Sequence, residues 1–290
     1  MSEIAGQTEM LLPGPALALG ALLDVPVPDL DNGAGLPLLW HWIYLLDRPA
    51  QADLGPDGHP VRGTVPAPPG LGQRRMWAGG RVRASGELRC GSLATKRTSV
   101  VRARDKQGRS GPLTFVVVRH QISQHGRVVI DEEQDIVYRD AASPAGAVQA
   151  SAPADRGPHI PPGDGERAIE VSPTLLFRFS ALTYNAHRIH YDRDYARDVE
   201  GYPGLLTHGP LQAVAMAEAA RAAARRGDED RGDLLFHYRL TAPLFDHQGM
   251  VVGASQEQDA IVTAVRDIHG RPTAEGRLTR EPHASDRQRR

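Results

Sequence analysis

Apolar and polar residues alternate along two parts of the chain, and in other parts apolar residues recur at helical spacing. The alternating runs are rich in Val, Ile and Thr and are separated by turn signals such as Gln124-His-Gly-Arg127, so they predict β-strands. Because the turns between them are short, the runs predict antiparallel meanders. We expect strands from about residue 80 onward, including 94–103, 113–123 and 127–138, and in the second half 234–240, 249–256, 260–267 and 273–279.

Helical signals are fewer. Gly209 and Pro210 predict a helix start, because the missing N–H of proline has no intrahelical acceptor in a first turn anyway. The alanine-rich segment that follows would let a sheet curl closely around this helix. In the first half, residues 36–46 are intensely apolar and aromatic, which predicts a three-turn buried helix at the centre of that half. Prolines interrupt residues 1–32, where we expect short helical pieces and a loop.

The chain of 290 residues is long enough for two modest domains. Residues 51–72 are rich in Gly and Pro and predict a loop, and the Ala, Pro, Gly and Ser of 141–165 predict a linker. The linker gives a first domain at 1–140, a second at 166–282 and a charged tail at 283–290.

Two short blocks recur in both halves, in the same order. Residues 102–109 share Arg, Asp, Gly and Arg with residues 264–271, and residues 82–88 similarly match 238–244. The recurrence indicates a duplicated unit of helix plus antiparallel sheet, an α+β arrangement. The alternative is that the first block is only a common hairpin turn.

Composition excludes several classes of function. The formal net charge is −1 and no long basic block is present, so nucleic acid is not an expected partner. No apolar run approaches the ~20 residues that a membrane span needs, and we expect a cytoplasmic protein without a membrane partner. The single Cys90 excludes an internal disulfide and a cysteine-based zinc cluster.

Proton-transfer groups are concentrated just before the predicted helix. Free N–H groups at the helix start, that of Gly209 among them, stabilise a partial negative charge nearby. This combination indicates an active site. Four side chains carry the signal within eight positions: Asn185, His187, His190 and Asp192.

These residues resemble the signature of the MaoC-like or hydratase-2 hot-dog family. Their sequence is similar to that of its type-2 hydroxyacyl-thioester dehydratase branch. The family pattern is an Asp, an Asn two positions later and a His five positions after the Asp, followed by a helix-starting Gly. Here Asn185 stands at the Asp position, His187 at the Asn position and His190 at the His position. The family's Asp is therefore absent.

Two further stretches, Leu39-Trp40-His41-Trp42 and 74–80, resemble the two-domain members of that branch, the mesaconyl-CoA (3-methylfumaryl-CoA) and itaconyl-CoA hydratases. The resemblance covers about residues 36–280. It implies a double hot-dog, in which two tandem antiparallel sheets each wrap around a central helix, and a homodimer of such chains. It also implies a hydro-lyase that hydrates an enoyl-CoA, in particular mesaconyl- or itaconyl-CoA to citramalyl-CoA. The first domain, which lacks the motif, would be non-catalytic and would shape the acyl pocket.

Hydration of an enoyl thioester requires a polarised carbonyl, an activated water and a proton for the α-carbon. The N–H of Gly209 suits the thioester oxygen, and His190 suits the proton exchange with water because imidazole titrates near neutral pH. Asn185 would hold the water or the substrate hydroxyl, since an amide is neither acid nor base. Proton transfer therefore rests on His190, unless His187 or Asp192 takes part.

Other residues are candidates for substrate contact. A dicarboxylic acyl group needs a cation for its far carboxylate, which Arg188 or Arg75 would provide, although Arg188 could equally pair with Asp192 or a coenzyme A phosphate. His208 either lines the pocket or caps the helix, and we expect the three tryptophans to lie in the core. The full set of substrate-binding candidates is Tyr184, His187, Arg188, Asp192, His208 and Arg75.

Several alternatives stay open. His187 and Asp192 could be ordinary hydrogen-bonding loop residues, or they could bind a metal together with His190. The resemblance is to cofactor-free enzymes, so we expect no metal and no cofactor, with coenzyme A as part of the substrate. The chain could also dehydrate straight-chain 3-hydroxyacyl groups on coenzyme A or acyl carrier protein, act as an acyl-CoA thioesterase, or bind acyl-CoA without catalysis.

Overall fold

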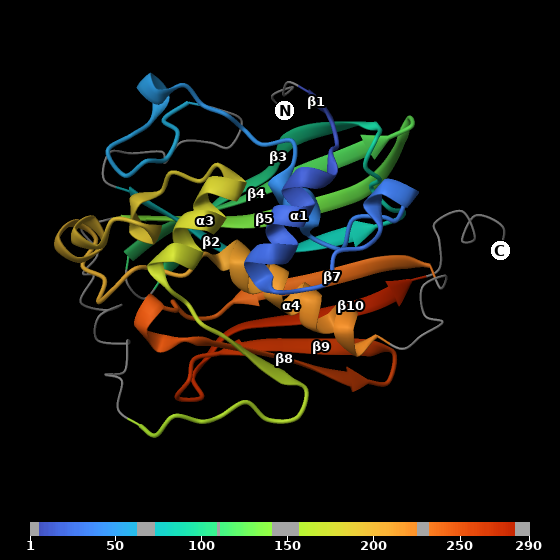
Figure 1. Ribbon diagram of the computed structural model, residues 1–290. Coiled ribbons are helices and arrows are strands. Elements are labelled where there is room, and N and C mark those ends of the chain that lie inside the picture. The colour runs from blue at the N-terminus through green and yellow to red at the C-terminus, as the bar shows by residue number, and fades with distance from the viewer. Residues whose placement is uncertain (1–5, 63–72, 109–110, 141–156, 225–231, 282–290) are drawn as a thin grey trace.

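One ten-stranded antiparallel sheet organises the molecule (Figure 1). The computed structural model describes residues 6–62, 73–108, 111–140, 157–224 and 232–281. Across the sheet the strands follow the order β1-β3-β4-β5-β2-β7-β10-β9-β8-β6. Their bounds are β1 Gln7–Met10, β2 Gln73–Ala84, β3 Leu93–Gly108, β4 Gly111–Gln124, β5 Arg127–Asp140, β6 Glu166–Ile169, β7 Asp233–Leu240, β8 Met250–Glu257, β9 Ala260–Arg266 and β10 Pro272–Glu281.

The strand order repeats itself. From its outer edge inward, the first half has the order β1-β3-β4-β5-β2 and the second half has the order β6-β8-β9-β10-β7. Each half thus places its first, third, fourth, fifth and second strand in turn, and the halves join where β2 pairs with β7. This repetition supports the predicted duplication and the predicted meanders. Strand β2 begins at Gln73, so the expected start near residue 80 was too late.

Only one of the two matched sequence blocks reflects the repeat. Residues 82–88 and 238–244 begin on β2 and β7, which are equivalent strands. Residues 102–108 of the first block instead lie at the end of β3, whereas 264–271 lead from β9 into β10, the counterparts of β4 and β5. Residue 109 lies outside the described residues. The first block is therefore a similarity of hairpin turns and not of position, which corrects the prediction.

Helix α4, Gly209–Ala223, confirms the predicted helix and its start. It packs across β8, β9 and β10, and its alanines are largely buried against them. The shorter α3, Pro173–Thr183, is capped by Ser172, whose hydroxyl accepts a hydrogen bond from the N–H of Leu175. The remaining helical turns are η1 Leu30–Asn32, η2 Trp40–Ile43, η3 Gln51–Asp53, η4 Arg188–His190, the π-helical η5 Tyr195–Val199 and η6 Asp246–Gln248.

The first half has no central helix of this kind in its described part. Residues 36–46 form only the single turn η2, and Leu39 and Leu45 on either side of it have φ values of 69° and 51°. The side chains explain the irregular path, because Trp40 donates to Glu218 of α4 while Trp42 donates to Glu132 of β5. The predicted three-turn helix was wrong. The helix of this half is α1, Pro13–Leu23, where proline occupies the first turn.

Buried side chains from both halves form one core that includes Leu19, Trp40, Leu176, Val214 and Phe236. None of the helices in the described ranges has the length and hydropathy of a membrane-spanning segment. Of the predicted linker, residues 157–165 form a loop and residues 141–156 lie outside the described residues. Residues 63–72 of the predicted loop and the predicted tail at 283–290 also lie outside them. The domain boundaries stay a prediction.

Candidate active site

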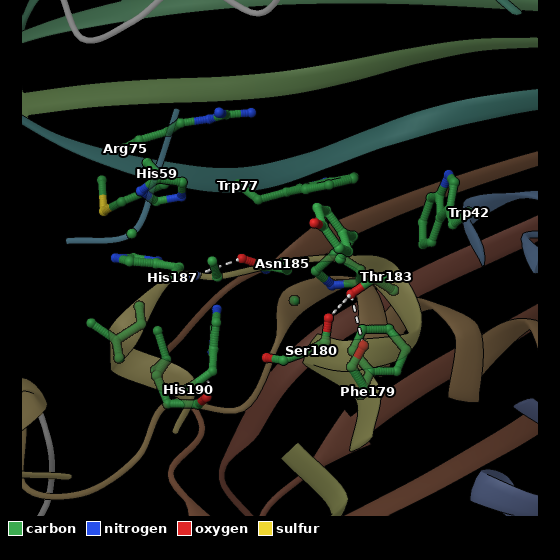
Figure 2. A pocket seen from close by; sticks show the side chains of 18 of the residues that line it. Trp42, His59, Arg75, Trp77, Phe179, Ser180, Thr183, Asn185, His187 and His190 are labelled. Carbon is green, nitrogen blue, oxygen red and sulfur yellow. Dashed lines mark hydrogen bonds between the residues drawn. The ribbon is translucent and has the colours of Figure 1, made fainter. Parts of the chain in front are cut away.

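A cavity of about 910 Å³ lies where the two halves meet, a size typical of a small-molecule site. Both halves contribute to its walls. The first half supplies η2 and the loop after it, β2, β4 and β5. The second half supplies the end of α3, the loop 184–191, the start of α4 and residues 240–244. Figure 2 shows His59, Arg75 and Trp77 on one wall, facing Asn185, His187 and His190 on the other.

His190 is held as a neutral base. Its Nδ1 lies 2.7 Å from the carbonyl oxygen of Leu206. A carbonyl only accepts hydrogen bonds, so Nδ1 carries the proton and Nε2 keeps its lone pair. Burial lowers the pKa of His190 to about 4, against the opposing effect of the Leu206 hydrogen bond and with a further contribution from His59. The ring is therefore uncharged and able to accept a proton at neutral pH.

His208 supports His190 from behind. The two rings stack with their centroids 3.7 Å apart and an interplanar angle of 18°. Nε2 of His208 is 2.8 Å from the hydroxyl oxygen of Ser180, and the side chain is fully buried. Burial and the neighbouring His190 hold the pKa of His208 well below its ordinary value. His208 is not among the cavity-lining residues, so its substrate contact stays a prediction. It occupies the N-cap position of α4, as the other predicted role requires, but its side chain makes no capping hydrogen bond.

Gly209 begins α4 at the cavity wall, as predicted. The first N–H groups of a helix have no intrahelical acceptors, and the helix dipole places partial positive charge there. A Cβ atom at this position would lie 2.2 Å from Cδ1 of Leu240. Glycine therefore leaves room for the Leu240 side chain of β7 against the helix start, where Gly209 borders the cavity.

Asn185 and His187 also line the cavity. Helix α3 ends at Tyr184, whose φ of 54° reverses the chain, and Oδ1 of Asn185 then accepts a hydrogen bond from the backbone N–H of His187 at 3.0 Å. Burial, His59 and His190 hold the pKa of His187 well below its ordinary value, so this ring is neutral as well. Tyr184 lines the cavity and is half exposed.

Arg188 and Asp192 are not among the residues that line the cavity, and their contact with substrate stays a prediction. The guanidinium of Arg188 donates to Oδ2 of Asp192 at 2.8 Å and lies 4.1 Å from the ring centroid of Tyr195. It also donates to the carbonyl oxygen of Pro56. The pair therefore fixes the loop 184–191 from the side away from the cavity. Pairing of Arg188 with Asp192 was one of the alternatives that the sequence left open.

Arg75 faces the cavity from β2. Its backbone pairs with Tyr138 of β5, but its guanidinium has no hydrogen bond or ion pair with another described residue, and burial lowers its pKa. Tyr138, Asp47 and Asp57 oppose that shift through their charges. An unpaired guanidinium beside a cavity is a ready site for an anionic group of a ligand.

Sequence reasoning missed the polar wall of the first half. Glu132 accepts hydrogen bonds from Trp42 and Gln134 and lies 2.9 Å from Nε2 of His41. Burial would raise the pKa of Glu132, but the hydrogen bond and charge of His41, the charge of His120 and the hydrogen bond of Gln134 lower it to about 2. Trp42 lines the cavity, and so does Trp77, so only Trp40 has the expected core position. The alternation of buried residues along β5 could have indicated an inward Glu132, but not its partners.

The loop before β2 was also missed. Asp57 and His59 line the cavity and contact each other through a 3.0 Å hydrogen bond. Their sequence, Gly55-Pro-Asp-Gly-His-Pro60, reads only as a turn. Among described residues, Asp57, His59 and His187 are the group whose spacing could hold a metal, with ligand atoms within 4.8 Å of one another. The set considered from the sequence, His187, His190 and Asp192, is not such a group.

Comparison with solved structures gives the class of fold. A MaoC-like dehydratase from Phytophthora capsici superposes with a TM-score of 0.66, covering 98% of this chain and 97% of that one at 17% identity. A conserved hypothetical protein from Mycobacterium tuberculosis described as a double hot-dog gives 0.52 over 96% of each chain at 16% identity. The chain has the double hot-dog fold, as predicted.

Sequence comparison gives the family. The profile described as hydroxyacyl-thioester dehydratase type 2 matches residues 39–246, and the chain belongs to that family. It is 46% identical over 233 residues to the mesaconyl-C(4)-CoA hydratase of Chloroflexus aurantiacus, across 80% of this chain and 79% of that protein. The predicted family and the predicted hydro-lyase class are confirmed.

Proposed function

We propose that this protein catalyses the reversible hydration of a branched five-carbon dicarboxylyl-CoA, mesaconyl-CoA (3-methylfumaryl-CoA) or itaconyl-CoA, to citramalyl-CoA. The observation that carries the proposal is that His190, with its tautomer set by Leu206, and the helix-start N–H of Gly209 border one cavity. The kinship with a mesaconyl-C(4)-CoA hydratase supports the acyl group.

The chemistry follows from these two groups. Nε2 of His190 accepts a proton from water while the water oxygen bonds to the β-carbon of the enoyl group. In mesaconyl-CoA, whose double bond is conjugated with the thioester, the electron pair of the double bond moves toward the thioester carbonyl, and its oxygen carries negative charge until the α-carbon is protonated. The N–H of Gly209 donates to that oxygen, and removal of one such donor typically costs ~10²–10³ in rate.

Asn185 contributes binding and not proton transfer. Its amide oxygen already accepts the backbone N–H of His187, which fixes the side chain at the cavity wall. The remaining amide N–H₂ group donates to the attacking water or to the product hydroxyl. Tyr184 and His187 complete the wall around the acyl group.

Arg75 supports a substrate with a second carboxylate. Its unpaired guanidinium borders the same cavity as His190, and a carboxylate placed there would receive two parallel N–H donors. A monocarboxylic acyl group would leave this cation without a partner. The proposal therefore favours mesaconyl- or itaconyl-CoA over a straight-chain acyl group.

A second candidate is dehydration of straight-chain 3-hydroxyacyl thioesters on coenzyme A or acyl carrier protein, which the family description favours. Loss of enoyl absorbance with mesaconyl- and crotonyl-CoA, together with chromatographic detection of citramalyl-CoA formed from itaconyl-CoA, separates the two. We expect the two dicarboxylyl substrates to be hydrated without thiol release. Preference for crotonyl-CoA would favour the second candidate, and release of free thiol would identify a thioesterase.

We further propose a location, a cofactor requirement, an oligomeric state and a domain division for the protein. The protein works in the cytoplasm without a cofactor, since coenzyme A enters as part of the substrate, and it forms a homodimer of double hot-dogs. Its domains are 1–140 and 166–282. Sedimentation equilibrium should give twice the chain mass of 31.4 kDa, and a monomer would contradict the dimer.

A further inference from the structure

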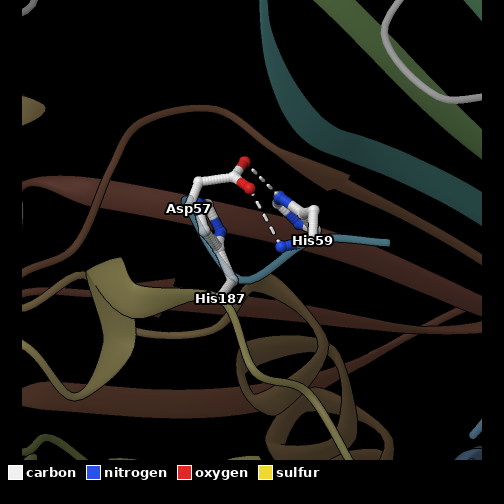
Figure 3. A group of neighbouring side chains, drawn as sticks. All are labelled: Asp57, His59 and His187. Atoms are coloured by element: carbon white, nitrogen blue, oxygen red, sulfur yellow. Dashed lines mark hydrogen bonds and ion pairs between the residues drawn. The ribbon is translucent and has the colours of Figure 1, made fainter. Parts of the chain in front are cut away.

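The loop before β2 carries a carboxylate–imidazole pair that the reaction above does not use. Oδ2 of Asp57 lies 3.0 Å from Nδ1 of His59, and Oδ1 of Asp57 accepts the backbone N–H of His59 at the same distance (Figure 3). Burial alone would raise the pKa of Asp57, but these two hydrogen bonds and the charge of His59 lower it. Asp57 is therefore an ionised partner that fixes the ring, with Nδ1 toward the carboxylate and Nε2 on the other side.

The pair is anchored on the catalytic motif of the other half. The N–H of Arg188 donates to the carbonyl oxygen of Asp57 at 2.9 Å, and its guanidinium donates to Pro56. Gly58, which lies between Asp57 and His59 in the chain, has a φ of +87°, and a Cβ there would lie 1.9 Å from the carbonyl oxygen of Ala186. Only glycine permits this backbone approach. The two loops are thus fixed to each other, although about 130 residues separate them in the sequence.

The anchoring places His59 in a row of rings that ends at His190. The ring of His59 lies 3.9 Å from that of His187, and the ring of His187 lies 5.4 Å from that of His190. All three rings line the same cavity. The position that carries the family's Asp is Asn185, so within the motif itself no carboxylate assists His190.

We propose that His59 is a second catalytic proton-transfer group and that Asp57 is its positioning residue, so that the first half supplies the function missing at position 185. This inference rests on the proposed hydration. It also revises the expectation that the first domain only shapes the pocket.

Two new bonds form on the enoyl group. His190 takes one proton from water as the C–O bond forms at the β-carbon, and the protonated ring of His59 gives its Nε2 proton to the α-carbon, where the second new bond forms. The imidazolium of His190 then returns a proton to His59 through water in the cavity. Both rings regain their starting states, and Asp57 stabilises the charged form of His59 as the carboxylate does in other carboxylate–imidazole pairs.

A divalent cation is the competing occupant of this cluster. One cation would need the planes of both imidazole rings to radiate from it, with a nitrogen of each directed at the ion. Here the rings of His59 and His187 overlap at 3.9 Å with an interplanar angle of 38°, and Asp57 already accepts two hydrogen bonds from His59. This geometry favours proton transfer.

The experiment compares the full-length wild type with His59→Ala and Asp57→Asn, using the best acyl-CoA of the panel above. We expect kcat to fall ~10²-fold or more in His59→Ala with KM within a few-fold, in the range of general acid–base catalysis. Added imidazole should restore part of the lost rate in His59→Ala. Asp57→Asn should lower kcat and should not respond to imidazole. The matched control His237→Ala, at an exposed position on β7, should behave as wild type.

Three results would overturn the inference. The first is a kcat within about threefold of wild type in His59→Ala. The second is a loss that imidazole does not restore, which would mean that His59 only anchors the loops. The third is stoichiometric metal in the purified wild type together with loss of activity on chelation. A wild type that hydrates no enoyl-CoA would instead refute the proposed function, so the two failures are distinguishable.

Discussion

Replacing His190 by Gln should make the protein less sensitive to acid. The wild-type ring is buried and neutral, with a pKa of about 4 in the folded state against 6.5 as the ordinary value. Because the folded-state pKa is depressed, its stabilising contribution is present above pH 6.5 and is lost as the pH falls toward 4. The unfolded chain binds the proton first and is favoured.

The size of the effect follows from the two pKa values. Between pH 8 and pH 5 the unfolded ring becomes almost fully protonated while the folded ring stays neutral, which amounts to about 2 kcal/mol of unfolding free energy. A glutamine does not titrate, and its amide can still donate to the carbonyl of Leu206. The variant should therefore lose about 2 kcal/mol less than wild type over this interval, whatever its stability at pH 8.

Urea unfolding at pH 8 and pH 5 measures the difference directly. His237→Gln, at an exposed position on β7, provides the control and should lose as much stability as wild type. Equal losses in wild type and His190→Gln would refute the assignment of His190 as a buried neutral base. The carboxylates with depressed pKa values, such as Glu132, lose their contributions only at lower pH and do not interfere.

Three further predictions use other contacts of the site. Arg75→Gln should lower kcat/KM for the dicarboxylyl-CoA substrate by ~10–100-fold, since a hydrogen bond to a charged group is lost, and should leave crotonyl-CoA turnover nearly unchanged; an equal loss on both would remove Arg75 from carboxylate binding. Gly58→Ala should lower both Tm and kcat, because its Cβ would meet the carbonyl of Ala186 at 1.9 Å, and wild-type values of both would contradict the anchored loop. Glu132→Gln should lower Tm, because His41 and Trp42 lose a charged acceptor, and an unchanged thermal unfolding curve would disprove that role.

The sequence was informative wherever structure is determined locally. Gly209 and Pro210 mark a helix start through backbone chemistry alone, and the strands of both meanders follow from their two-residue alternation. The motif from Asn185 to His190 was recognisable because its spacing is that of the family. These features depend on neighbouring residues in the chain and not on the fold around them.

The rest depends on contacts that no local pattern encodes. Residues 36–46 are apolar enough for a helix, yet Trp40 and Trp42 find acceptors on α4 and β5, and those contacts decide the backbone path. His59 gains a catalytic environment only because Gly58 lets its loop reach Ala186 in the other half. Likewise, Arg188 lies inside the motif sequence but points away from the cavity, toward Asp192 and Pro56.

The most direct test is a crystal structure of the protein with a saturated, non-hydratable analogue of the acyl-CoA substrate. The account predicts that the thioester oxygen lies about 3 Å from the backbone nitrogen of Gly209 and that the β-carbon faces Nε2 of His190. An acyl group bound elsewhere in the cavity, with the N–H of Gly209 and the ring of His190 contacting different parts of the ligand or none, would contradict it.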